Sequence, residues 1–304
     1  MTEPMAITLE TPRDAHAAKA GEGAVACVAS YTAYGVPITL KTTANLMDVL
    51  PSPLIPGAVS SALEGESAVV FRFYPTPGSA GRPLFVVGEG ERAIFASADV
   101  REAARVLESR VHLRAAALTK EYVFVHAGVV QWGGHALLLP GASHTGKSSM
   151  VAALVAAGAQ YYSDEYAVID LDGRVRAFPR RLRLRENGVE KPGVADGAEP
   201  VKTSALDPLS LGWVLNLRFR DGAVWSPKEL TPGQTLLALL ENTVAVRRQS
   251  ELTLRTLKLA IEPTKGWQSE RGDAAHAAVE VLRMIGENSN VHGVQAEVSQ
   301  GRTR

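Results

Sequence analysis

The pattern of apolar and polar residues changes near residue 120, and this change organises the chain. Before that point, short runs of β-branched and aromatic residues lie between Gly and Pro signals, which is typical of strands. Four segments have this composition: 24–33, 67–75, 83–89 and 92–97. They indicate an N-terminal unit with a sheet of its own.

The segment 97–118 predicts a helix that follows these strands. Apolar residues recur in it at helical spacing, which places them near one face. They are Val100, Ala103, Ala104, Leu107 and Val111. Ser97 precedes the first of them and is the candidate N-cap.

Longer apolar runs mark the second part of the chain. Residues 121–130 are almost continuously apolar, as expected of a strand buried on both faces. A turn at 132–135 leads to a second buried strand at 136–140. A glycine-containing loop and a helix at 147–157 follow, and Gly158 stands where helices often end.

The pattern beyond this helix predicts more strands and helices. Strands are expected at 160–163 and 166–171, a hairpin turn at Asp172-Gly173, a strand pair at 211–219 and 222–227, and helices at 231–246 and 273–287. The order of elements predicts an α/β protein. We expect a smaller N-terminal α+β domain over 1–115, a larger α/β domain over 116–287 and a mobile tail over 288–304.

Composition and charge narrow the class of protein. Lys plus Arg (32) equals Asp plus Glu (32), whereas nucleic-acid-binding domains are usually basic. No run reaches the roughly 18 apolar residues of a membrane helix, and no signal peptide is visible. Cys27 is the single cysteine, which excludes an intrachain disulfide and fits a reducing compartment. We expect a cytoplasmic protein that binds neither nucleic acid nor membrane.

Residues 141–148, "GASHTGKS", fit the pattern G-x-x-x-x-G-K-[ST]. The two glycines allow backbone angles that turn successive N–H groups towards phosphate oxygens, and the following helix presents its positive end to the same oxygens. Lys147 would reach the β- and γ-phosphates, and the Ser148 hydroxyl would bind Mg²⁺. The candidate nucleotide-binding residues are Gly141, Ala142, Ser143, His144, Thr145, Gly146, Lys147, Ser148 and Ser149. The alternative is a glycine turn with an exposed lysine.

Asp164 and Glu165 are the nearest carboxylates along the chain, and they stand where a strand after the loop and helix would end. Adjacent residues of a strand point to opposite sides, so one carboxylate could face the γ-phosphate while the other serves a metal or a structural partner. An exposed acidic turn is the alternative. Asp170 and Asp172 are weaker candidates, because the Asp172-Gly173 turn already explains Asp172.

His126 interrupts the apolar run of 121–130. It is either a hydrogen-bonded structural histidine or a contact to the terminal phosphate or the acceptor. Arg181, Arg183 and Arg185 alternate with leucines, so a strand would place them on one face. Such a row either binds phosphate or an acidic substrate, or forms a solvated face. No Cys/His cluster has zinc-ligand spacing, and no G-x-S-x-G nucleophile motif is present.

Three stretches occur in one order at short spacing: "VHAGVV", "LLLPGASHTGKSS" and "AGAQYYSDEYAVI". On these stretches the region 120–185 resembles the HPr kinase/phosphorylase group. It is most similar to the HPr-kinase-related proteins that carry a different N-terminal domain. The resemblance implies a P-loop kinase domain related to phosphoenolpyruvate carboxykinase, ATP and Mg²⁺ as cofactors, and transfer of the γ-phosphate to a serine hydroxyl.

The resemblance also implies roles for single residues. Asp164 matches the family's catalytic base, and Lys147 is the loop lysine. Glu165 stands where the family often has a second aspartate, so it would serve the metal together with Ser148. His126 matches the histidine of the family's "H-G" strand motif, although Ala127 separates it here from the glycine.

The sequence departs from the bifunctional enzymes of this group, which carry a later Glu-Arg-Gly segment for metal binding and phosphorolysis. The nearest stretch is "RLRLRENG", in which Glu186 is no secure equivalent. We therefore expect a serine kinase whose acceptor is a protein or peptide, recognised with help from the N-terminal domain. A nucleotide-binding regulatory protein without transfer activity and a small-molecule kinase are the alternatives, and assembly into a homo-oligomer is left open.

Overall fold

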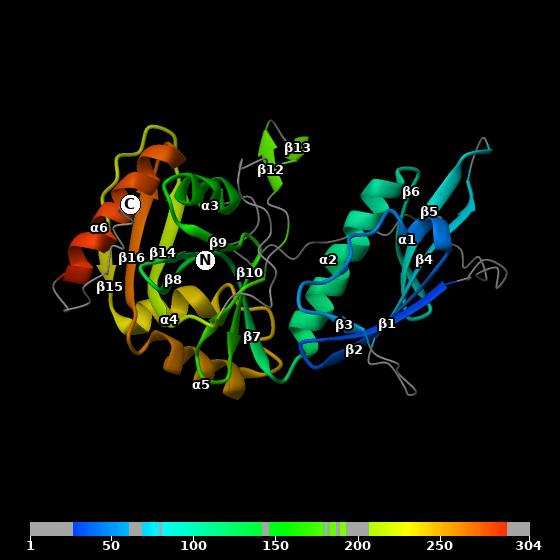
Figure 1. Ribbon diagram of the computed structural model, residues 1–304, viewed down its shortest axis with the longest axis horizontal. Coiled ribbons are helices and arrows are strands. Elements are labelled where there is room, and N and C mark those ends of the chain that lie inside the picture. The colour runs from blue at the N-terminus through cyan, green and yellow to red at the C-terminus, as the bar shows by residue number, and fades with distance from the viewer. Residues whose placement is uncertain are drawn as a thin grey trace, which may run out of the picture.

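The computed structural model describes residues 27–60, 69–78, 81–141, 146–178, 180, 183–186, 189–192 and 207–290. Within them the chain is mixed α/β, with two mixed sheets and six helices. Figure 1 shows a unit built on the first sheet beside a larger unit built on the second. The predicted α/β class is confirmed at this level.

The first sheet has the strand order β3-β1-β2-β4-β5-β6. Its strands are β1 (Cys27–Ala33), β2 (Val36–Thr42), β3 (Val59–Ser60), β4 (Val69–Pro77), β5 (Pro83–Glu89) and β6 (Arg92–Ser97). The short helix α1 (Ala44–Met47) follows β2. Neighbouring strands are antiparallel except β2 and β4, which run parallel. All four strands predicted in this region are present, and β2 and β3 are additions to them.

Helix α2 (Val100–Leu118) packs on β4, β5 and β6. Its N-cap is Asp99, whose carboxylate accepts a hydrogen bond from the Arg101 N–H at 2.8 Å. The prediction of Ser97 as the cap is wrong, because its hydroxyl accepts from the Asp99 N–H and donates to Glu102. Asp is as good a cap as Ser, so the local signal did not separate the two residues. The predicted apolar face is buried at Ala103, Ala104, Leu107 and Val111.

The second sheet has the order β11-β10-β7-β8-β14-β16-β15, with β9 also paired to β7. Its strands are β7 (Tyr122–Trp132), β8 (His135–Pro140), β9 (Gln160–Ser163), β10 (Tyr166–Asp170), β11 (Val175–Arg176), β14 (Leu211–Phe219), β15 (Lys228–Leu230) and β16 (Lys265–Arg271). A separate hairpin joins β12 (Arg183–Glu186) to β13 (Val189–Pro192). Strands β8, β14 and β16 are parallel, so their carboxyl ends lie along one edge of the sheet.

Helices cover both faces of this second sheet (Figure 1). Helices α3 (Lys147–Ala156) and α6 (Ala274–Asn290) pack on one face, and α4 (Pro232–Leu240) and α5 (Ser250–Ile261) pack on the other. Each pair closes a separate hydrophobic cluster, as in a three-layer α/β fold. None of the helices in the described part of the chain is long and apolar enough to cross a membrane.

The predicted pairing of strands 211–219 and 222–227 is wrong. Strand β14 lies between β8 and β16, and residues 222–227 join it to β15 without a strand of their own. Neither β16 nor α5 was predicted. The sequence of β16, "KGWQSER", is mostly polar, and burial of Trp267 and Arg271 in it follows only from its place between β14 and β15.

The two units meet through one continuous hydrophobic cluster. It includes the first sheet and α2, and it extends to Phe124 and Phe178 of the larger unit. The Tyr34 ring packs edge-on against the rings of Tyr122 and Phe124, with centroids 5.4 and 4.9 Å apart. The predicted domains 1–115 and 116–287 thus share a core where α2 ends and β7 begins.

A close contact between β7 and α3 yields a stability prediction. A Cβ added to Gly128 would lie 2.5 Å from Val151 Cγ2. We expect Gly128→Ala to lower the free energy of unfolding by about 1–3 kcal/mol, because α3 must move away from the strand. Urea unfolding followed by circular dichroism measures this.

The matched control is Gly233→Ala at the exposed start of α4, where an added Cβ meets nothing within 4 Å. It should leave the free energy of unfolding unchanged or raise it by up to about 1 kcal/mol, because alanine is the better helix former. Equal stability of the Gly128 variant and the wild type would contradict the packing of α3 on β7.

Candidate functional site

The loop predicted to bind phosphate joins the carboxyl end of β8 to the N-terminus of α3. Its middle residues, Ala142, Ser143, His144 and Thr145, lie outside the described residues. At its start, the Gly141 N–H donates to the His126 carbonyl at 3.1 Å. At its end, Gly146 is the N-cap of α3 and has a left-handed backbone with φ 82°. The backbone angle that the glycine pattern requires is therefore present at Gly146.

Lys147 is the first residue of α3, and its side chain turns back over the loop. Its ammonium donates to the Gly141 carbonyl at 2.6 Å. Burial lowers the pKa of Lys147 to about 8, although the negative charges of Asp164 and Glu165 oppose this shift. The ammonium thus lies close enough to both predicted acids for their charges to act on it.

Asp164 is buried and accepts hydrogen bonds from two hydroxyls. Ser148 Oγ of α3 donates to its Oδ2 at 3.1 Å, and the Tyr161 hydroxyl of β9 donates to its Oδ1 at 3.0 Å. Burial raises the pKa of Asp164, while the charge of Arg180 and the Tyr161 hydroxyl oppose the rise. The structure therefore brings together Ser148 and Asp164, which are 16 residues apart in the sequence.

Glu165 has a different set of partners. Its Oε2 accepts from Arg180 Nη1 and lies 3.3 Å from Nδ1 of His112, a residue of α2. Burial alone would raise the pKa of Glu165, but His112 and Arg180 together lower it to about 2. Arg180 Nε also lies 3.9 Å from Asp164 Oδ1, so one guanidinium faces both acids.

The sequence placed the two acids on a strand, at its end. In the structure they follow β9 and form the short connection between β9 and β10. The Ala127 N–H donates to the Glu165 carbonyl at 3.2 Å, which fixes this connection against β7. The alternative of an exposed acidic turn is wrong, because the Asp164 side chain is buried.

His126 is half-buried, and its ring lies beside the Tyr166 ring at a tilt of 35°, with centroids 4.5 Å apart. It lies in β7 two residues before Gly128, and residues two apart share a face of a strand. That face carries α3 at Gly128. Burial lowers the pKa of His126, and the positive charge of Lys147 lowers it further. The histidine is thus on the side of the sheet that carries the loop lysine.

Arg271 ends β16 and lies against the loop. It is 4% exposed, and its guanidinium donates to the carbonyls of Gly146 and Gly272 at 3.0 Å. Its guanidinium also lies over the Phe219 ring at the end of β14, 5.2 Å from the centroid. The parallel strands therefore bring a buried cation and the N-terminus of α3 to one edge, where α/β sheets usually bind ligands.

Several predicted residues lie apart from this group. Ser149 is exposed on α3. Asp170 ends β10 away from Glu165, and its carboxylate binds the backbone of the Asp172 turn and Arg176. Arg181 lies outside the described residues, as do the side chains of Arg183, Arg185 and Glu186.

Sequence reasoning missed four residues of the site: Tyr161, Arg180, His112 and Arg271. Arg180 directly precedes the predicted arginine row, so a search for partners of the acidic pair could have included it. His112 has a stronger signal, since it follows Val111 on the apolar side of a predicted helix and is buried there. Arg271 had no signal of comparable strength because β16 itself was not predicted.

The described residues contain no group of three or more His, Cys, Asp or Glu that could hold a metal by itself. Mg²⁺ usually binds through one or two carboxylates together with substrate phosphates, so it needs no such group. The contacting oxygens of Ser148 and Asp164 are the donors that Mg²⁺ prefers, and they fit a metal that a nucleotide brings with it.

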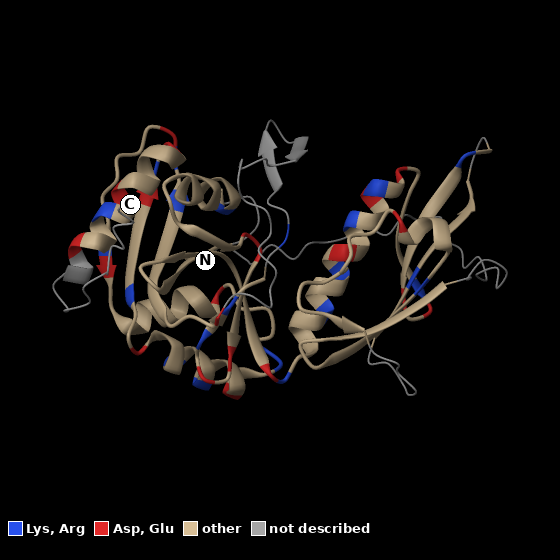
Figure 2. Ribbon diagram, viewed as in Figure 1, with Lys and Arg blue, Asp and Glu red and all other residues tan. Residues whose placement is uncertain are grey.

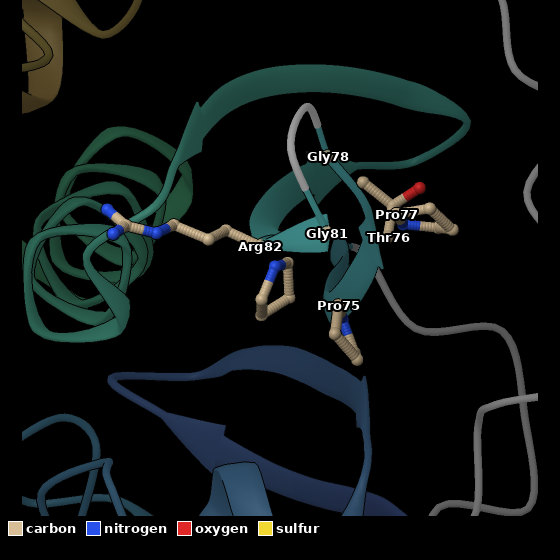
Figure 3. A pocket seen from close by; sticks show the side chains of 7 residues that line it. Pro75, Thr76, Pro77, Gly78, Gly81 and Arg82 are labelled. Atoms are coloured by element: carbon tan, nitrogen blue, oxygen red, sulfur yellow. The ribbon is translucent and has the colours of Figure 1, made fainter.

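Two hollows of about 320 Å³ each lie elsewhere in the described structure. One is at the tip of the β4–β5 hairpin, where Figure 3 shows Pro75, Thr76, Pro77 and Arg82 around it. The other lies between the units and is bordered by Tyr34. None of the loop or acidic residues lines either hollow, so we assign the candidate site from its contacts.

No protein-family model matches this sequence, and no curated protein matches it at a significant level. The assignment of the site consequently depends on the residues and geometry of this chain alone.

The depressed pKa of Glu165 predicts a pH dependence of stability. Its folded value of about 2 lies below its ordinary value of 4.5, so the carboxylate stabilises the fold fully above pH 4.5. This contribution is lost as the pH falls towards 2. We expect Glu165→Gln to lower the free energy of unfolding by about 3 kcal/mol at pH 7, and by less at pH 3.

Urea unfolding at both pH values checks this, with Glu262→Gln at an exposed position as the control. The control should follow the wild type. A Glu165 variant that loses the same free energy at both pH values would show that the carboxylate charge is not what stabilises the cluster.

Proposed function

We propose that this protein is an ATP-dependent kinase with a P-loop domain of the HPr kinase type, acting on a serine-type hydroxyl of a protein or peptide. One observation carries the proposal: Ser148 at the N-terminus of α3 donates its hydroxyl to the Asp164 carboxylate, next to the ammonium of Lys147. A loop serine paired with a buried aspartate is the arrangement with which P-loop enzymes hold the metal of a nucleotide.

Charge near the loop supports the binding of phosphates. The N-terminus of α3, Lys147 and Arg271 are all positive and lie around Gly146. Lys147 now donates to the Gly141 carbonyl, which is a weaker acceptor than a phosphate oxygen. A bound triphosphate would therefore attract this ammonium away from the loop backbone.

The acids supply the remaining functions. Bound Mg²⁺ would neutralise charge on the phosphates as the γ-phosphoryl group leaves. Asp164 is buried and accepts a hydrogen bond from the Ser148 hydroxyl. It can therefore bind the metal together with Ser148 or accept the proton of the acceptor hydroxyl. Glu165 would join the metal only when Arg180 releases it.

The elements around the stretches that resemble the HPr kinase group agree with a P-loop domain. A buried strand with His126, a second strand, the loop, a helix and a strand before the acidic pair are present as β7, β8, α3 and β9. His126 shares the α3 side of the sheet and would face the terminal phosphate or the acceptor.

A nucleotide-binding regulatory protein is the second candidate, and Arg180 favours it. This guanidinium faces both Asp164 and Glu165, and a nearby positive charge makes a carboxylate a weaker base. A protein that binds ATP and changes conformation, without transfer, would need no free base. A small-molecule kinase would use the same residues with a closed acceptor site.

Asp164→Asn separates the kinase from the regulatory protein. We expect this variant to bind ATP in EDTA within about two-fold of the wild type and to lose about 100-fold or more in the rate of phosphoryl transfer, because the amide cannot accept a proton. Transfer of label from γ-labelled ATP to proteins and peptides of a cell extract provides the rate. An undiminished rate would remove Asp164 from catalysis, and binding without transfer by the wild type would favour the regulatory protein.

Lys147→Ala tests the phosphate loop itself. Loss of a charged hydrogen bond of about 1.5–3 kcal/mol should weaken ATP binding by roughly 10-fold or more, measured by calorimetry. The control is Lys258→Ala on the exposed side of α5, which should bind ATP like the wild type. Equal affinity of both variants would place ATP elsewhere.

A further inference from the structure

Helix α2 belongs to the N-terminal unit, yet it places two polar residues against the candidate site. Glu108 and His112 are one helical turn apart on its buried side, and they are 7% and 1% exposed. The charge of Glu108 acts on Arg180, and His112 contacts Glu165. Charged residues of both signs line α2 (Figure 2), but these two face the protein interior.

Both ring nitrogens of His112 have oxygen partners, and each partner belongs to a different unit. Nε2 donates to the Leu54 carbonyl at 3.0 Å, in the segment between α1 and β3. Nδ1 lies 3.3 Å from Glu165 Oε2. The Phe178 ring meets the edge of the imidazole with centroids 5.2 Å apart. The ring is therefore held from several sides and cannot turn without breaking a contact.

These contacts continue to the loop. Glu165 shares Arg180 with Asp164, and Asp164 accepts from Ser148 at the start of α3. Each member is at least half-buried, so its neighbours determine where it lies. A shift of His112 would thus be passed through Glu165 and Arg180 to Asp164.

Packing alone does not require a histidine at this position. The surrounding cluster is apolar, and a buried polar ring costs free energy unless its hydrogen bonds are made. An apolar side chain would fill the space, but it would leave the Leu54 carbonyl and Glu165 without this partner. The specific gain from an imidazole is a pair of directed contacts, one to the Leu54 backbone and one to Glu165.

We propose that His112 is a positioning residue, through which the N-terminal unit fixes the acidic pair for the metal of a bound nucleotide. This inference rests on the proposed function. The candidate site is then complete only when the N-terminal unit is docked.

Two substitutions distinguish this role from simple packing. Asparagine carries an amide nitrogen as many bonds from Cβ as the histidine Nδ1, and glutamine carries one as many bonds away as Nε2. His112→Asn therefore keeps a donor towards Glu165, and His112→Gln keeps a donor towards the Leu54 carbonyl. If His112 only fills space, the two variants should bind Mg-ATP with similar affinity. If it positions Glu165, the glutamine variant should bind Mg-ATP more weakly than the asparagine variant.

Calorimetry on the full chain measures the affinity for ATP with Mg²⁺ and with EDTA, and the first value divided by the second is the ratio to compare. Loss of an outer partner of a metal ligand typically costs 10- to 100-fold in metal affinity. We expect His112→Gln to reduce the ratio by about 10-fold while ATP affinity in EDTA stays within about two-fold, and His112→Asn to keep most of the ratio. His276→Gln, at an exposed position of α6, should match the wild type.

The results separate the positioning role of His112 from the proposed function. A wild-type ratio in the glutamine variant, or equal loss in both variants, overturns the positioning role and leaves the nucleotide site standing. A wild type that binds no ATP overturns the proposed function itself. If the glutamine variant does not fold, the ring nitrogen NMR signals of His112 in the wild type replace it. They should move when Mg-ATP is added and stay in place with ATP and EDTA, and unchanged signals under both conditions overturn the proposal.

Discussion

The buried contact of Arg180 with both Asp164 and Glu165 is the interaction on which the site depends. Two adjacent carboxylates repel each other strongly in an interior of low dielectric, and one guanidinium between them allows both to be buried. Without it, burial of both carboxylates in their charged form would cost several kcal/mol more free energy. The same cation is paired with both acids in this structure. The pairing stabilises the site, but it must weaken before a metal can bind the acids.

The second constraint is the parallel arrangement of β8, β14 and β16. It collects at one edge the loop that follows β8 and Arg271 at the end of β16, although these segments are far apart in the sequence. Arg271 donates to the backbone carbonyls of Gly146 and Gly272, so its positive charge lies next to the N-terminus of α3. Anion binding at this edge is therefore a property of the sheet as much as of the loop motif.

The N-terminal unit contributes to this edge through α2. Its helix covers the first sheet with one part of its surface and reaches Glu165 with His112, so the shared core and the polar contact form one interface. This arrangement makes the acidic pair sensitive to how the units are docked, because Glu165 has partners in both of them.

The sequence by itself determined the elements whose signals are local. The apolar runs of β7 and β8, the glycine-bounded loop, the start of α3 and the Asp172-Gly173 hairpin all depend on residues close together in the chain. Only the tertiary structure decided which charges meet, because Arg180, His112 and Arg271 reach the site through pairings of distant segments. The polar strand β16 and the pairing of β14 with β8 and β16 also depend on the tertiary structure, because neighbouring segments, and not local composition, stabilise them. The acids could thus be identified from residues nearby in the chain, whereas the cations that contact them could be identified only from the tertiary structure.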